Sequence, residues 1–288
     1  MSVLRELVAE ELGLPVDPRA AALAKGIAAK HGKASRAVLF YGSCLREKQL
    51  DGLMLDFYLI VSDYRAAYGK SWLAAANRLI PPNVFYFEED GLAAKYAVLS
   101  EADFHRLNGP ETSSVSVWAR FAQPSRLAWA KNAAARKRAI DAVSRAAPTL
   151  LWAAGERRRE DALDWWRRSF ALTYSAELRT ERRVKIASVV DVEPERYRRF
   201  TKAALPQVRK HESRRGPSWP WRRVEGKGLS VLRLAKASLT FAGGADYIAW
   251  KINRHAGTDI ELTPWQRRHP LLAGLSLLPR LLKSGAVR

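Results

Sequence analysis

Alternating apolar and polar stretches divide the first part of the chain into short helices and strands. Apolar positions at helical spacing predict two helical pieces over residues 2–31, with Pro15 and Pro18 between them. Continuous apolar runs at residues 37–42 and 53–62 predict two strands. Because both runs lack polar alternation, we expect each strand to be covered on both faces.

The same pattern continues over the next forty residues or so. Residues 71–79 have helical spacing, and Pro81-Pro82 is expected to stop that helix. Aromatic and β-branched residues predict strands over 83–87 and 95–100. The segment Ser100-Glu101-Ala102-Asp103 is typical of a capping box that opens a further helix. Residues 36–100 are therefore expected to form one mixed sheet with flanking helices.

From about residue 112 onward the apolar spacing is mostly helical. It predicts long amphipathic helices over 128–147 and 160–179, and a helix over 229–254. Residues 206–228 are rich in Pro, Trp, Arg and Gly, so we expect a loop or linker there. The expected fold class is α+β, with a mixed sheet and flanking helices followed by a mostly helical C-terminal part.

The chain has 288 residues, which is more than one hydrophobic core usually organises. We expect a sheet-containing domain over residues 1–110, a helical domain over 111–205, and a linker with C-terminal helices over 206–288. The final stretch, 269–288, is apolar and basic. Two interpretations of it stay open: a helix docked on the protein core, or a segment lying in a membrane interface.

The charge balance narrows the class of partner. The net charge is +20, from 49 Lys and Arg against 29 Asp and Glu, and it indicates a polyanionic partner. Nucleic acid, an anionic membrane and phosphate-rich substrates all fit that charge. Cys44 is the only cysteine, which excludes an internal disulfide and a Cys-based zinc site. No stretch of about 18 apolar residues predicts a membrane span, and no secretion signal is visible, so we expect a cytoplasmic protein.

The first two predicted strands carry the clearest candidate chemistry. The first ends in Tyr41-Gly42-Ser43, where small residues let backbone N–H groups approach a phosphate. Asp56 lies in the middle of the second, otherwise apolar strand. A carboxylate beside a phosphate requires a cation between them, and Mg²⁺ is the usual one. The pattern favours metal-dependent phosphoryl or nucleotidyl transfer, with Ser43 on phosphate and Asp56 on the metal. A plain turn and an Asp paired with a basic residue would give the same letters.

Four motifs, in this order, resemble those of the mitochondrial-type phosphatidate cytidylyltransferases, also called CDP-diacylglycerol synthases, of the nucleotidyltransferase superfamily. The resemblance runs over residues 36–245. The motifs are Tyr41-Gly42-Ser43, Leu55-Asp56-Phe57, Lys95-Tyr96-Ala97-Val98-Leu99 and Tyr174-Ser175-Ala176-Glu177-Leu178-Arg179.

The chain departs from the family pattern at several of these positions. Cys44 and Ala97 replace glycines, and Glu177 stands where Asp is usual. Met54 and Tyr58 occupy the positions where the wider superfamily has a second acid two residues from the first.

The resemblance implies a nucleotidyltransferase-like fold and a reaction in which CTP and phosphatidic acid give CDP-diacylglycerol and pyrophosphate with Mg²⁺. It implies Asp56 as a metal ligand and Lys95 as a triphosphate contact. The further substrate-binding residues that it implies are Gly42, Ser43, Tyr174, Arg179 and Lys185. The expected partners are CTP, phosphatidic acid and an anionic membrane surface, and the expected location is the cytoplasmic face of an inner membrane.

The second metal ligand stays open among Asp51, Glu88 and Glu89. We favour Glu88 because it follows directly after the third predicted strand.

Two other functions also stay open. One is a nucleotidyltransferase acting on a small molecule, a protein or an RNA end. The other is a non-catalytic basic RNA-binding protein. No RNP-type motif or Gly-x-x-Gly loop supports the latter, so nucleic acid is not the expected partner.

Overall fold

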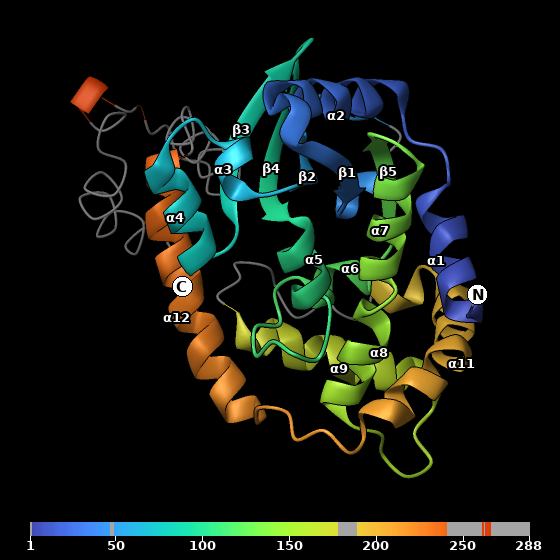
Figure 1. Cartoon of the computed structure of the whole chain (residues 1–288). Coiled ribbons are helices and arrows are strands. Elements are labelled where there is room, and N and C mark those ends of the chain that lie inside the picture. The colour runs from blue at the N-terminus through green and yellow to red at the C-terminus, as the bar shows by residue number, and fades with distance from the viewer. Residues whose placement is uncertain (1, 47–48, 178–188, 241–260, 262, 266–288) are drawn as a thin grey trace.

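The structure is a computed structural model of the whole chain (Figure 1). It describes residues 2–46, 49–177, 189–240, 261 and 263–265.

One five-stranded mixed sheet lies at the centre of the described part of the chain (Figure 1). Its strand order is β3-β4-β2-β1-β5. Strands β2 and β4 are parallel, and the other neighbouring pairs are antiparallel. The strands are β1 (Ser35–Tyr41), β2 (Met54–Val61), β3 (Asn83–Glu89), β4 (Leu92–Ser100) and β5 (Ser125–Ala130).

The helices fall into three groups along the chain. Those before the sheet are α1 (Val3–Leu12) and α2 (Pro18–Lys30). Those between strands are α3 (Tyr64–Ala67), α4 (Ser71–Leu79), α5 (Glu101–Leu107) and α6 (Trp118–Phe121). Those after β5 are α7 (Ala133–Val143), α8 (Ala146–Ala154), α9 (Ala162–Ala176), α11 (Pro194–His211) and α12 (Trp219–Thr240). Two 3-10 turns, Gly32–Ala34 and Ser43–Arg46, flank β1.

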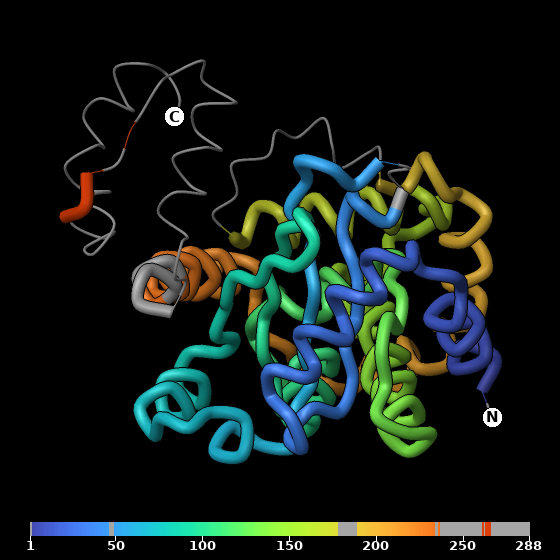
Figure 2. The backbone as a smooth tube through the Cα atoms, turned by 90° about the horizontal axis from the view of Figure 1, so that it is seen from above, coloured from blue at the N-terminus to red at the C-terminus, as the bar shows by residue number. Residues whose placement is uncertain are grey.

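Helix α2 covers one face of the sheet, as the view in Figure 2 shows. The side chain of Asp17 accepts a hydrogen bond from the Arg19 amide and caps the helix, and Pro18 fits its first turn. Its apolar side packs against alternate strand residues, which fill a single buried cluster. That cluster includes Leu23, Ala24, Ile27, Val38, Phe40, Phe57, Leu59, Tyr96 and Val98.

The opposite face packs against the helical part of the chain. Strand residues such as Leu39, Tyr58 and Ala97 share one buried cluster with Trp118 and Trp166. Because residues of the sheet and of the later helices pack in one cluster, this core joins the two parts of the chain. Helix α12 returns to the β3 side of the sheet, whereas α1 and α11 lie on the other side in both views (Figures 1 and 2).

The expected α+β architecture is confirmed, with a mixed sheet, flanking helices and a mostly helical C-terminal part. The helix over residues 71–79 is present, and the Ser100 hydroxyl caps α5 by accepting a hydrogen bond from the Asp103 amide at 3.1 Å. Among the described helices, none has the length and apolar character that a membrane crossing requires.

Two predicted elements were wrong. The helix expected over 128–147 begins with part of β5, because residues 125–130 pair with the free side of β1 before α7 starts. The loop expected over 206–228 is mostly helical. Helix α11 continues to His211 with Pro206 inside it, and α12 begins at Trp219. Proline is tolerated in the first turn of a helix, so Pro220 does not prevent that early start.

The boundaries expected at residues 110 and 205 stay predictions. Strand β5 nevertheless comes from beyond residue 110 and completes the sheet. The second half of the helix expected over 229–254, and most of the tail over 269–288, lie outside the described residues.

Candidate active site

A row of five polar or hydroxyl-bearing residues crosses the sheet, one from each strand. Register pairs Ser125 with Tyr41, Tyr41 with Asp56, Asp56 with Lys95, and Lys95 with Tyr86. Residues that are paired directly across neighbouring strands project to the same face. Their neighbours two positions along, such as Leu39 and Tyr58, belong to the core shared with the helical part. The row therefore lies on the face of the sheet that packs against the helical part of the chain, opposite the face that α2 covers.

Asp56 and Lys95 form the centre of this row. The Lys95 ammonium lies 3.1 Å from Asp56 Oδ1, and the two side chains are 38% and 21% exposed, respectively. Asp56 Oδ1 itself is shielded from solvent and has no partner in hydrogen-bonding geometry among the described residues. An ion pair without that geometry neutralises charge but leaves the oxygen's hydrogen-bonding capacity unused.

Gly42 brings backbone directly against the same carboxylate. Its φ is +95°, a conformation that side-chain-bearing residues rarely adopt. A Cβ atom at position 42 would lie 3.2 Å from Asp56 Oδ2. A side chain at position 42 would therefore crowd the carboxylate, and glycine permits this close approach of the backbone. Ser43 follows at once, exposed, in the four-residue 3-10 turn.

Arg120 and Glu177 bring a second charged pair to this face. Arg120 Nη1 lies 3.6 Å from Glu177 Oε1 and donates hydrogen bonds to the carbonyl and the hydroxyl of Ser116, the latter at 2.8 Å. Burial alone would lower the pKa of Arg120, but Glu177, then Tyr58, Tyr41 and Asp56, raise it above its ordinary value. Arg120 therefore stays charged beside two carboxylates.

Helix α12 adds two more cations. Arg233 donates a hydrogen bond to the Pro81 carbonyl at 2.8 Å and to the Ser114 hydroxyl at 3.4 Å. Lys236, one turn further along, donates to the Ile80 carbonyl. Burial, and then the nearby Arg233, lower the pKa of Lys236 to about 8. Uncharged carbonyl groups just before β3 thus hold both side chains.

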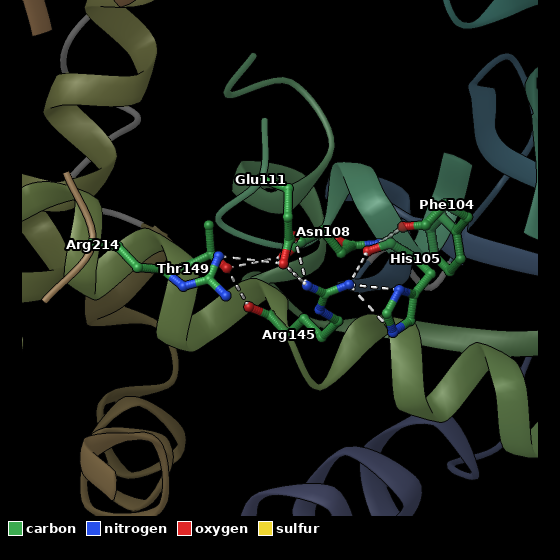
Figure 3. Close-up of polar contacts among 7 residues, drawn as sticks. All are labelled: Phe104, His105, Asn108, Glu111, Arg145, Thr149 and Arg214. Carbon is green, nitrogen blue, oxygen red and sulfur yellow. Dashed lines mark hydrogen bonds and ion pairs between the residues drawn. The ribbon is translucent and has the colours of Figure 1, made fainter. Parts of the chain in front are cut away.

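The segment that carries Ser114 and Ser116 is fixed from the other side. Figure 3 shows the Arg145 guanidinium between Glu111 and His105, and Arg214 beyond Glu111. Arg145 Nη2 lies 2.6 Å from both Glu111 carboxylate oxygens. Arg222 of α12 donates to the Ser113 carbonyl at 2.5 Å. These contacts fix the segment in place. The segment in turn positions Arg120 and Arg233, which donate hydrogen bonds to Ser116 and Ser114.

The residues expected at the site do not all come together. Asp56, Lys95, Gly42 and Ser43 do. Glu88 does not: it lies exposed on β3 and accepts a hydrogen bond from Tyr86. Strand β4 separates β3 from β2, so the backbones of the strands that carry Glu88 and Asp56 are about 10 Å apart.

The other expected residues lie as follows. Asp51 pairs with Arg19 at 2.9 Å, and Glu89 lies beside Gly26 of α2. Tyr174 is half-buried on α9 and packs against the core that the sheet shares with the helical part of the chain. Arg179 and Lys185 lie outside the described residues.

The donor set bears on a metal ion in a limited way. No group of three or more His, Cys, Asp or Glu side chains in the described ranges could hold a metal. Mg²⁺ in phosphate chemistry, however, is often held by one or two carboxylates together with waters and substrate phosphates. Asp56, whose buried Oδ1 has no hydrogen-bond partner among the described residues, fits that kind of ligation.

The cations Arg120, Arg233 and Lys236 and the acid Glu177 were missed by reasoning from the sequence. Glu177 lay within one of the four motifs, at a position where the resembling family has an acid, and Arg120 and Lys236 lay within looser matches to that family at residues 117–125 and 236–244. No protein-family model matches the chain, and a search of curated proteins finds no match.

Proposed function

We propose that the protein is a metal-dependent nucleotidyltransferase that transfers the cytidylyl group of CTP to phosphatidic acid. The observation that supports this most strongly is the contact of Gly42 and Lys95 with the same carboxylate, Asp56. A glycine, a carboxylate and a lysine at one strand end suit a metal ion bound to a nucleoside triphosphate. The choice of CTP and phosphatidic acid rests on the ordered motif resemblance.

In this proposal, a phosphate oxygen of phosphatidic acid attacks the α-phosphorus of CTP. The new oxygen–phosphorus bond replaces the bond to the β-phosphate, and pyrophosphate leaves. The nucleophile is already an anion, so no strong general base is required. The chain's task is to align the two substrates and neutralise the charge that builds up on the leaving group.

Asp56 would hold Mg²⁺, which supplies charge neutralisation for the triphosphate. In the structure Lys95 neutralises this carboxylate. Lys95, which lies 3.1 Å from the same carboxylate, would contact the triphosphate. The Gly42-Ser43 backbone lies on the same side and offers N–H groups to phosphate oxygens.

The net charge of +20 supports work at an anionic lipid surface, since basic residues near such a surface are attracted to it. We infer a peripheral association with the cytoplasmic face of a membrane.

The test is an acceptor and nucleotide survey with the full chain in mixed micelles containing Mg²⁺. Radiolabelled CTP with phosphatidic acid should give CDP-diacylglycerol. Diacylglycerol, which lacks the attacking phosphate, should give no product. Turnover of another nucleotide with a soluble acceptor would favour the broader nucleotidyltransferase alternative. Tight, salt-dependent RNA binding without any turnover would favour the RNA-binding alternative.

A further inference from the structure

Uncharged groups hold most of three basic side chains, Arg120, Arg233 and Lys236. Arg233 and Lys236 donate to the neighbouring carbonyls of Pro81 and Ile80, and Arg233 also contacts the Ser114 hydroxyl. In the portion of the chain that is described, neither side chain has a carboxylate within ion-pair distance. Arg120 lies 3.6 Å from Glu177, and Glu177 and Glu225 act on Arg233 from beyond ion-pair distance.

These three cations lie close together. Arg120 and Arg233 are anchored to Ser116 and Ser114, two residues apart on one segment, so the Cα atoms of these two serines are within about 7 Å. Lys236 is three residues after Arg233, and residues at that spacing share one face of a helix. Arg120 and Arg233 both act electrostatically on Tyr58, and Arg120 also acts on Arg233.

Such an arrangement is unfavourable in the absence of an anion. Lys236 is 8% exposed, and burial lowers the pKa of both Arg233 and Lys236. A buried charge without a close opposite charge is costly, and a bound anion would lower that cost. Like charges held in position by fixed neutral acceptors are a preorganised site for an anion.

We propose that Arg120, Arg233 and Lys236 form a phosphate-binding site that begins near Asp56 at Arg120 and that helix α12 completes. The inference rests on the proposed function for the source of the phosphate, which is the triphosphate of the nucleotide or the phosphomonoester of the lipid. The site itself requires only a phosphate group. Helix α12 thereby becomes part of the binding machinery rather than a covering element.

The experiment measures binding without turnover, so that it is independent of catalysis. Isothermal titration calorimetry of the full chain uses tripolyphosphate in one arm and short-chain phosphatidic acid, below its micelle concentration, in the other. The variants are Arg233→Gln and Lys236→Gln. The matched control is Lys227→Gln, which removes the same charge from an exposed position on the same helix.

We expect each site variant to weaken binding in at least one arm about tenfold, and the control to bind like the wild type. Loss in the tripolyphosphate arm assigns the site to the nucleotide, and loss in the lipid arm assigns it to the acceptor. Equal affinity of site variants and wild type in both arms, or an equal loss in Lys227→Gln, would overturn the proposal.

Arg233 and Lys236 also hold the Ile80-Pro81 turn, so their variants could lose stability. The wild type provides an independent check. A phosphate ligand that binds only the folded state raises the melting temperature, and the rise keeps growing as the ligand concentration increases above Kd. Absence of any such rise with either ligand would refute the site without recourse to a variant. Binding without cytidylyl transfer would keep this site and refute the proposed function alone.

Discussion

The backbone of Gly42 lies so close to the Asp56 carboxylate that a side chain at position 42 would press on Oδ2. The φ of +95° and the 3.2 Å separation between a Cβ atom and Oδ2 are independent reasons for glycine at this position. Gly42, which follows β1, and Asp56 of β2 thus form one unit. The backbone conformation at Gly42 sets the space around the carboxylate.

Gly42→Ala is predicted to lower both stability and activity. The positive φ alone costs about 1–2 kcal/mol for a residue with a Cβ atom. Displacement of the Asp56 carboxylate should lower cytidylyl transfer by about 10- to 100-fold. The matched control is Gly32→Ala, whose φ is +51° but which has open space around its Cβ position. The control should lose similar stability and keep its specific activity. Equal activity of the two folded variants would argue against a role for the Gly42–Asp56 contact.

Glu11 and Arg196 are predicted to form the ion pair that matters for attaching α1 to α11. The side chains are 11% and 8% exposed, and Arg196 Nη2 lies 3.0 Å from Glu11 Oε1. Glu11→Ala leaves a buried guanidinium unpaired, which costs about 3–5 kcal/mol. The neighbouring pair of Glu10 and Arg199 is exposed, so Glu10→Ala should cost less than about 1 kcal/mol. Denaturant unfolding measures both, and a similar loss in the two variants would contradict this account.

His31 is predicted to make stability depend on pH. Its Nδ1–H donates to the Ala67 carbonyl at 3.0 Å, so Nε2 accepts from the Tyr96 hydroxyl at 3.1 Å in the neutral ring. Burial, and secondarily Lys30, lower the pKa of His31 below its ordinary 6.5. The unfolded chain therefore binds the proton more readily. The stability that His31 contributes is fully present above pH 6.5 and is lost as the pH falls through 6.5 towards the lower folded-state pKa.

The measurement is the melting temperature between pH 7.5 and 5.5. His31→Gln should show a shallower decline towards acid than the wild type, since it has no ring to protonate. His105 and His211 also have lowered pKa values, so part of the decline should persist. An unchanged slope in His31→Gln would show that its ring does not titrate differently on folding.

The sequence was sufficient to locate the centre of the candidate site because that centre is local. Asp56 and Gly42 lie on strands that follow one another in the chain and pair directly, and Lys95 lies on the next strand but one. Apolar runs and turn residues reveal such neighbours. They do not reveal strand order, and the prediction of Glu88 beside Asp56 required β3 and β2 to be adjacent.

The rest of the site depends on elements far apart in the chain. Arg120 follows the long connection after β4, and Arg233 lies on a helix more than a hundred residues later. Helical spacing predicts that α12 has two faces but not which surface it covers. The position of Ser125 could not be predicted either. The strand that carries it pairs with the free edge of β1, and no local signal in the sequence distinguishes this strand from the start of a helix.

The central claim is that Asp56 is the acid of a cytidylyl-transfer site. The most direct test is CDP-diacylglycerol formation from CTP and phosphatidic acid by the wild type, Asp56→Asn and Asp51→Asn, each checked for folding. Asp51 is an exposed acid of the preceding loop that pairs with Arg19, so it is the matched control. We predict product from the wild type and Asp51→Asn, and a loss of about 100-fold or more in Asp56→Asn. Undiminished activity in folded Asp56→Asn, or no product from the folded wild type, would contradict the claim.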